Sequence, residues 1–298
     1  MFGVYFGKFL ADKGKLTLGQ LEDMLTNSAN SKVKLGLLAV EYGYMTTQQA
    51  DEVNTLQQLQ DKRFGDIAIE KGYLTQQQVG ELLESQGDSY LLFIQTLTEN
   101  NILALGDIQT ELNEFKAAEG FTAKDMEAIK SGDVDRITPI FMKDEAISQP
   151  VKDYISLMAR NMVRFIDRNF RMEKVEVISE YQTEYLASQS MKGDHQIFVA
   201  FGGDGEGIRK MAQSYAKEDF SQVDMDVIDA ACEFLNCNNG LFATGACESG
   251  VEVDMEPPVM KTEPVTLRTD GIMYRVPMSV ENGEVDLIIG FDQAVELS

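Results

Sequence analysis

A sequence motif recurs every 29 residues in the first third of this chain. Its copies open with the segments FGKFLADKGKLT, LGLLAVEYGYMT and FGDIAIEKGYLT, whose first glycines are Gly7, Gly36 and Gly65. A fourth segment in the same register, FIQTLTENNILA, has Ile94 at the position of this glycine. Self-similarity at such a period is the signature of one supersecondary unit stacked on copies of itself. The repeat therefore restricts the first third of the chain to an array of small, similar units.

Each unit is predicted to be a pair of helices. The first helix should end at a second glycine, where the backbone needs a positive φ that glycine adopts at little cost and asparagine tolerates. A threonine three residues later should begin the next helix, with a glutamine three residues beyond it to complete a capping box. We expect residues 1–118 to form an all-α domain of helix pairs. The positions involved are Gly14, Gly43, Gly72 and Asn101 for the helix ends, and Thr17 with Gln20, Thr46 with Gln49 and Thr75 with Gln78 for the boxes.

The two central copies resemble the MshEN domain, a tandem-motif module at the N-terminus of type II secretion and pilus ATPases. Its motif opens with Arg-Leu-Gly, has a second glycine at the tenth position and closes with glutamine at the twenty-fourth. Many members bind cyclic di-GMP through both motifs. A basic side chain can stack on guanine or pair with phosphate, and glycine lets a backbone approach closely. The resemblance therefore implies these ligand contacts: Lys34, Gly36, Gln57, Arg63, Gly65 and Gln86.

The match to that motif is incomplete, and a purely structural interpretation stays open. Lys34 stands where the motif has arginine, and it lacks the planar, forked guanidinium. Ala39 and Ala68 replace larger aliphatic residues, and Asn54 falls on an expected apolar position. In the structural interpretation, the glycines and glutamines serve only the packing and capping of the helix pairs.

The chain is strongly acidic, which narrows the classes of partner. Its 298 residues carry 49 acidic against 26 basic side chains, a formal net charge of −23. General binding to DNA or RNA, and binding to anionic membrane surfaces, both depend on Lys and Arg. No apolar run reaches the roughly 18–20 residues of a membrane helix, and an odd count of three cysteines fits a reducing compartment. We therefore expect a cytoplasmic protein that neither binds DNA or RNA nor inserts into membranes.

The rest of the chain is predicted to hold a connector over residues 119–149 and a second domain over residues 150–298. The order of its elements, with consecutive strands at the end and Asn-Gly as a hairpin turn between the last two, indicates an α+β domain with an antiparallel sheet. The whole chain is thus expected to be a multidomain protein. Hydrophobic periodicity predicts a helix at 154–169, strands at 174–182 and 195–203, helices at 206–217 and 224–241, and strands at 250–256, 264–268, 271–280 and 284–291.

The predicted helix at 224–241 carries one narrow polar stripe. At 100° per residue, the stripe and the glycine beyond it fall within an arc of about 80°, and apolar side chains occupy the other side. Residues three apart on a helix present together, and a glycine one turn further on would let another surface come close. A solvated helix face remains the plain alternative interpretation. The stripe consists of Asp226, Asp229, Glu233 and Asn236, followed by Gly240.

The segment IDAACEFLNCNNG around this stripe resembles the CheX/CheC/FliY family of bacterial chemotaxis phosphatases, whose signature is Glu-x-x-Asn on one helix. The resemblance implies a CheX-like domain in which Glu233 and Asn236 are catalytic and the substrate is the phospho-aspartate of a CheY-like response-regulator receiver. The receiver would supply Mg²⁺ and its own Lys, so this chain would need no metal or cofactor. The Asn236 amide would orient the attacking water, and Glu233 would pair with that Lys.

Further expectations concern the number of sites, the oligomeric state, the alternative function and one glycine-rich turn. An earlier helix has Asn161 but Met158 where Glu or Ser would be needed, so a single catalytic site is implied, as in CheX, together with a homodimer. The alternative function is a non-catalytic adaptor that binds a receiver domain or cyclic di-GMP without turnover. The sequence GGDG at 202–205 follows a predicted strand, but Glu206 stands where a phosphate-binding loop of this type usually has Thr, so we expect a plain strand-to-helix turn.

Overall fold

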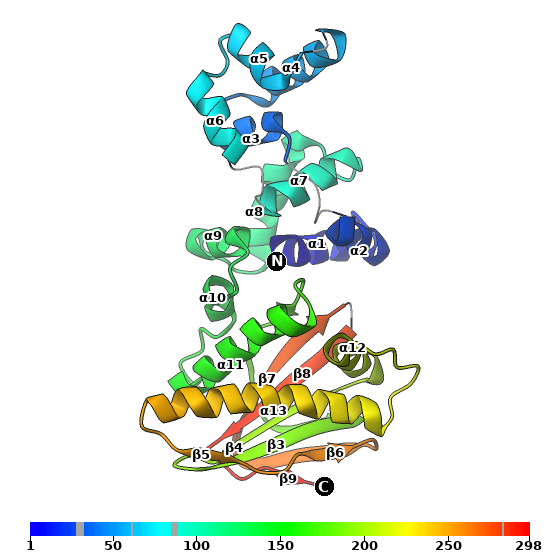
Figure 1. Ribbon diagram of the computed structural model, residues 1–298, viewed down its shortest axis with the longest axis vertical. Helices are drawn as coiled ribbons and strands as arrows, with labels where there is room; N and C mark the ends of the chain where they lie inside the picture. Colours follow the sequence, from blue (N-terminus) through cyan, green and yellow to red (C-terminus); the bar gives the residue numbers. More distant parts are fainter. Residues whose placement is uncertain (28–32, 61, 85–88, 282) are drawn as a thin grey trace. The chain divides into compact units, whose positions relative to one another are not determined.

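The computed structural model describes residues 1–27, 33–60, 62–84, 89–281 and 283–298. The chain divides into two compact units, Met1–Gly132 and Asp133–Ser298, so the division lies inside the segment that we expected to be a connector (Figure 1). That segment is largely helical. Helix α9 (Ala123–Ser131) belongs to the first unit, and the short α10 (Val134–Ile137) belongs to the second.

The first unit consists of helices and turns throughout its described residues. The positive φ predicted at the helix ends is confirmed, with values of 69° at Gly14, 70° at Gly43, 71° at Gly72 and 55° at Asn101. The three predicted capping boxes also form. In each, the threonine hydroxyl accepts the glutamine N–H at 3.2 Å and the glutamine Oε1 accepts the threonine N–H at 2.8 Å. The helices before α9 are α1 (Phe2–Asp12), α2 (Leu18–Asn27), α3 (Leu35–Glu41), α4 (Thr47–Gln60), α5 (Phe64–Glu70), α6 (Gln76–Glu84), α7 (Ser89–Glu99) and α8 (Ile108–Ala118).

The first glycine of each copy lies where two helices pack too closely for a side chain. A Cβ atom added at Gly65 would lie 3.0 Å from Val79 on the next helix. One added at Gly36 would lie 3.0 Å from the ring of Phe64, and one added at Gly7 would overlap Leu21. Helix packing therefore accounts for glycine at these positions without a ligand.

The second unit is an α+β domain around an antiparallel sheet, as predicted. The strand order is β1-β7-β8-β4-β3-β5, with β2 and β9 paired to β7 and β6 paired to β3, and every pairing is antiparallel. The strands are β1 (Arg171–Met172), β2 (Glu176–Thr183), β3 (Tyr185–Gly193), β4 (Ile197–Gly203), β5 (Val253–Met255), β6 (Val259–Lys261), β7 (Val265–Val280), β8 (Gly283–Phe291) and β9 (Glu296–Leu297).

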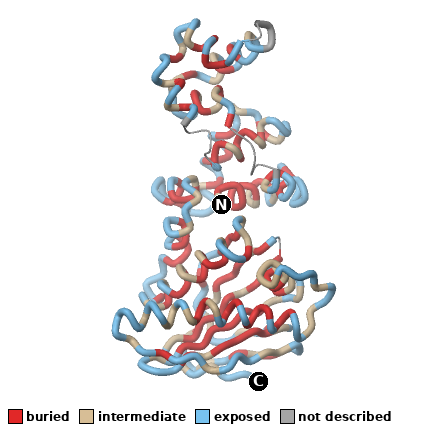
Figure 2. The backbone as a smooth tube through the Cα atoms, in the orientation of Figure 1, coloured by how far each residue is buried: buried red, intermediate tan, exposed pale blue. Residues whose placement is uncertain are grey.

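Helices cover one face of this sheet, and the sheet's own curl covers the other. Helix α12 (Gly205–Ala216) contacts β4 and β8, and α13 (Met225–Glu248) crosses β3, β5 and β6 (Figure 1). Side chains of β3, β4 and β8 that face away from these helices pack against the first half of β7 and against β2. Figure 2 shows the central strands as the most continuously buried part of this unit. The buried members of this second core are Leu186, Phe198, Ala200, Val265, Leu267, Met273 and Ile288.

Several element boundaries differ from the sequence prediction. The helix expected at 154–169 is α11 (Gln149–Asn161), which has a Pro in its first turn. It continues as one π-helical turn to Ile166. Its predicted core residues Ile155 and Met158 are buried, but Phe165 is 37% exposed. The strands predicted at 264–268 and 271–280 form the single bent strand β7, whose register with β2 shifts between Ile178 and Glu180.

Helix α13 extends to Glu248 instead of ending at 241. A single glycine in a helix costs only about 1 kcal/mol relative to alanine, so Gly240 does not end it. The chain turns away from the helix after Glu248, at Gly250, whose φ is +82°, and Val251 N–H donates to Ala246 O. The expectation for 202–205 is confirmed: Asp204 caps α12 by accepting the N–H groups of Glu206 and Gly207, which makes a strand-to-helix turn. Among the helices in the described part of the chain, none combines the length and apolar character needed to cross a bilayer.

Candidate functional site

Helix α13 presents the predicted polar stripe to solvent. Asp226, Asp229, Glu233 and Asn236 are all exposed. Phe234 anchors the helix by stacking on Phe201 of β4, with 5.9 Å between ring centroids. The opposite side of the helix is therefore fixed against the sheet, and this fixes the outward direction of Glu233 and Asn236. The buried residues of α13 include Val227, Ile228, Ala231, Phe234 and Leu235, as predicted.

The amide of Asn236 is held from below by the sheet. Gln189, on β3, is 3% exposed, and its Nε2 donates to Asn236 Oδ1 at 2.9 Å and to the backbone oxygen of Glu256 at 2.9 Å. Gln189 Oε1 accepts from Asn239 Nδ2 at 2.8 Å, and Asn239 Oδ1 accepts from the Tyr154 hydroxyl at 2.5 Å. A continuous line of buried hydrogen bonds thus runs from α11 through α13 and β3 to the exposed amide.

Glu233 has a different environment. Its carboxylate is exposed, and Tyr215 of α12 lies beside it, with the Tyr215 ring 5.2 Å from that of Phe234. Partial burial raises the pKa of Tyr215, and the neighbouring Cys237 thiol and Glu233 carboxylate raise it further. The phenol beside the stripe is therefore neutral at physiological pH.

The surface around Asn236 is also open and partly apolar. A Cβ atom added at Gly240 would lie 3.7 Å from Met255 Cε, and Met255 is 42% exposed. Met225, at the start of α13, is 50% exposed. The polar stripe is therefore bordered by exposed methionines, whose flexible thioethers adapt to a partner surface.

Gln189 and Tyr215 were not predicted from the sequence as residues of the site. No strand was predicted over 185–193, because the side chains of β3 alternate poorly and its buried positions include Ser188 and Gln189. One signal was available: the two strands predicted on either side left a structureless stretch of about a dozen residues, which is long for a compact domain.

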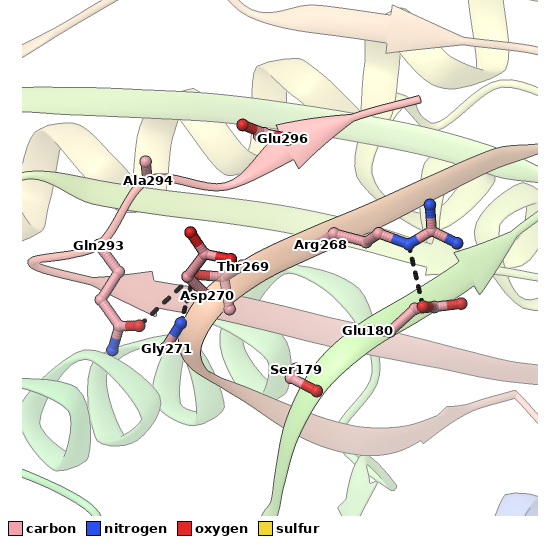
Figure 3. Close-up of a pocket in the computed structure, with 9 residues that line it drawn as sticks. All are labelled: Ser179, Glu180, Arg268, Thr269, Asp270, Gly271, Gln293, Ala294 and Glu296. Carbon is pink, nitrogen blue, oxygen red and sulfur yellow. Dashed lines mark hydrogen bonds and ion pairs between the residues drawn. The ribbon is translucent and has the colours of Figure 1, made fainter.

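Two other recesses are found among the described residues of the second unit. One, of about 580 Å³, lies where β7 bends beside β2, and it is lined by Arg268 in an ion pair with Glu180 at 2.9 Å and by Asp270, Gln293 and Glu296 (Figure 3). The other, of about 390 Å³, lies between α11 and the last turns of α13. Within the described residues, no group of three or more His, Cys, Asp or Glu side chains could hold a metal ion.

The structure gives weaker support to the ligand contacts implied for the first unit than to the stripe on α13. Lys34 and Arg63 are both exposed, and each is the residue just before a short helix, α3 or α5. Lys34 forms an ion pair with Glu99 at 2.6 Å. Gly36 and Gly65 are buried in the helix contacts described above. Gln57 is exposed on α4, and Gln86 lies outside the described residues.

Comparison with known proteins finds one family model that matches part of the C-terminal unit. Residues 185–273 match the family model described as chemotaxis phosphatase CheX. The matched range begins at β3, contains α12 and α13, and ends inside β7, so it includes Gln189, Glu233 and Asn236. No curated relative matches the sequence.

Several solved structures are similar to about half of this chain. A CheC-like superfamily protein from Shewanella sp. PV-4 is 16% identical, with a TM-score of 0.42, and the match covers 48% of this chain and 96% of that one. A CheX protein from Desulfovibrio desulfuricans is 13% identical, with a TM-score of 0.43 and coverage of 48% and 99%. A CheX–CheY–BeF3–Mg complex from Borrelia burgdorferi is 16% identical, with a TM-score of 0.40 and coverage of 49% and 98%.

Proposed function

We propose that the C-terminal unit accelerates hydrolysis of the phospho-aspartate of a CheY-like response-regulator receiver. The observation that carries this proposal is the exposed pair Glu233 and Asn236 on α13, inside the range that matches the CheX family model. The buried support under Asn236 agrees with a role in chemistry, because a solvated surface amide needs no such support.

The proposed reaction is phosphoryl transfer to water. The water oxygen bonds to phosphorus while the bond between phosphorus and the aspartate oxygen breaks, which releases inorganic phosphate and regenerates the carboxylate. Catalysis of such transfers consists mostly of positioning and charge stabilisation. The Asn236 amide orients the water in line with phosphorus. Its Oδ1 accepts one bond from Gln189, which leaves a second lone pair for a water hydrogen.

Glu233 is assigned to docking. Its exposed carboxylate pairs with the Lys of the receiver, and Asp226 and Asp229 on the same stripe favour the approach of a basic group. Mg²⁺ belongs to the receiver in this proposal and stabilises charge on the phosphoryl oxygens.

The test is the decay of a phosphorylated receiver with and without the full-length chain. Asn236→Ala should abolish the acceleration while the protein stays folded, because Asn236 is an exposed side chain and water can replace its hydrogen bond from Gln189. Thr244→Ala is the matched control, since Thr244 is exposed on the same helix two turns further on. Full activity in Asn236→Ala would refute the assignment. A wild-type protein that binds the receiver without changing its decay would be an adaptor instead.

For the first unit, we propose cyclic di-GMP as a ligand of the surface that carries Lys34 and Arg63. The supporting observation is that these two exposed basic residues occupy equivalent positions in successive copies of the repeat. Guanidinium and ammonium groups of this kind suit phosphate and guanine.

A further inference from the structure

Gln189 contacts the exposed site through a hydrogen bond from its side-chain amide to Asn236. The neighbouring groups determine which atom of each amide takes part in this bond. We infer that Gln189 is a positioning residue, which holds the Asn236 amide in one of its two orientations so that Oδ1 stays available to the attacking water. This inference rests on the proposed function and deepens it.

The orientation of the Gln189 amide follows from its contact with a backbone oxygen, which can only accept hydrogen bonds. The backbone oxygen of Glu256 lies 2.9 Å from the Gln189 amide, so the atom facing it must be the nitrogen Nε2. The same nitrogen lies 2.9 Å from Asn236, so the facing atom of Asn236 must be an acceptor, Oδ1. With both hydrogens of Nε2 used, Gln189 cannot turn over without losing both bonds.

The far end of the network supports the same direction. Gln189 Oε1 accepts from Asn239 Nδ2 at 2.8 Å, and the Tyr154 hydroxyl donates to Asn239 Oδ1 at 2.5 Å. Burial raises the pKa of Tyr154, so the hydroxyl keeps its proton and remains a donor. Tyr154, Asn239 and Gln189 are each at most 3% exposed, and reversing any amide would leave buried polar groups unpaired.

The consequence for catalysis concerns which atoms reach the water. An unsupported surface amide exchanges its nitrogen and oxygen by rotation, so the wrong atom faces the substrate part of the time. In this structure, one hydrogen bond donated by Gln189 Nε2 fixes the plane of the Asn236 amide. The second lone pair of Oδ1 then lies in a fixed direction, and such pre-organisation lowers the barrier to an in-line attack.

The test compares two substitutions in the full-length chain. In Gln189→Glu, the carboxylate can accept from Asn239 but cannot donate to Asn236 or to Glu256 O. Gln189→Met keeps the length of the side chain without either function. Both should lower kcat for receiver dephosphorylation by about 10- to 100-fold, as misplacement of a catalytic group does. KM for the receiver should stay within about threefold, because docking through Glu233 is untouched.

Ser188→Ala is the matched control. Ser188 precedes Gln189 on β3, is 1% exposed, and donates a hydrogen bond to Val259 O at 3.1 Å. This side-chain hydrogen bond goes to Val259 O and not to Asn236. This variant loses a buried hydrogen bond of the same kind and should keep the wild-type kcat.

Comparison with Ser188→Ala separates positioning from general destabilisation. Both variants lose buried hydrogen bonds, so a large loss of kcat in Gln189→Met with none in Ser188→Ala would come from the lost positioning. If Gln189→Met keeps the wild-type kcat, the positioning role is wrong while the proposed function stands. If wild type and Asn236→Ala give the same receiver decay, the proposed function fails and the positioning role falls with it.

A measurement on the Gln189 side-chain amide by NMR covers the case in which neither Gln189 variant folds. Both Nε2 hydrogens should exchange slowly with solvent in wild type, since both are bonded and buried. In Asn236→Ala, one of them should exchange faster. Equal exchange in the two proteins would overturn the inference.

Discussion

Glu233 and Asn236 lie three residues apart on α13, yet their surroundings suit different tasks. Asn236 accepts a hydrogen bond from a residue that is itself fixed by buried partners. Glu233 is an exposed carboxylate beside the half-buried phenol of Tyr215. A rigid amide suits the positioning of water, and an adaptable carboxylate suits contact with a long, basic side chain of a partner.

Substitution of Glu233 should therefore weaken docking more than chemistry. Glu233→Gln removes the charge and keeps the shape. We expect KM for the phosphorylated receiver to rise about tenfold, while kcat changes by less than about threefold. Steady-state rates at increasing receiver concentration measure both constants.

Added salt provides the control for this prediction. The KM of wild type should rise with ionic strength more steeply than that of Glu233→Gln, because the variant has lost the screened interaction. A variant with normal KM and a greatly reduced kcat would instead place Glu233 in the chemical step.

At the scale of elements, α13 determines where the site lies. Its sequence predicted the stripe, because the helical period separates Asp226, Asp229, Glu233 and Asn236 from the apolar side, and the structure exposes all four. The support under the stripe was not predictable in the same way. Gln189 and Asn236 are 47 residues apart in the sequence, and a pattern within one helix holds no information about a partner on β3.

Gly240 should matter for access to the site, since it lies one turn beyond Asn236. Gly240→Trp places a large ring there and should lower kcat/KM for the receiver by at least about tenfold. Gly245→Trp is the matched control on the same helix, where an added Cβ meets no atom within 4 Å. Rates for the two variants give the comparison, and equal activity would show that the receiver does not approach along this turn.

Two glycine-to-alanine substitutions in the first unit should have opposite effects on its stability. Gly72 has a φ of 71°, so Gly72→Ala should lower the free energy of unfolding by roughly 1–2 kcal/mol. Gly80 lies within α6 with open space around it. Gly80→Ala should therefore raise the free energy of unfolding by about 0.5–1 kcal/mol. Urea denaturation followed by circular dichroism measures both. A stabilising effect of Gly72→Ala would mean that the helix does not end as described.

At the scale of the whole molecule, the two units differ in how much of their structure is local. In the first, the helix ends and capping boxes are local, which is why a repeat of glycine, threonine and glutamine predicted them, while α1 also packs against α7, α8 and α9. The second pairs distant segments, such as Arg171 of β1 with Ser279 of β7. The net charge of −23 belongs to both, and the basic side chains at Lys34 and Arg63 stand out against it.

Cyclic di-GMP should bind the full-length chain through that basic surface. Isothermal titration calorimetry should detect binding to wild type, and Arg63→Ala should remove it, because the guanidinium supplies the contact to guanine or phosphate. Lys62→Ala should leave it intact, since Lys62 precedes the motif and is not one of the positions implied as ligand contacts. The absence of heat at tens of micromolar ligand would contradict the proposal.

The central claim is that this chain is an enzyme that acts through Asn236. Its most direct test is the release of inorganic phosphate from a phosphorylated receiver present in excess over the full-length protein. We predict that each wild-type molecule releases many phosphates and that Asn236→Ala releases none above the receiver's own rate. Phosphate release at the same rate with wild type, with Asn236→Ala and without protein would contradict the account.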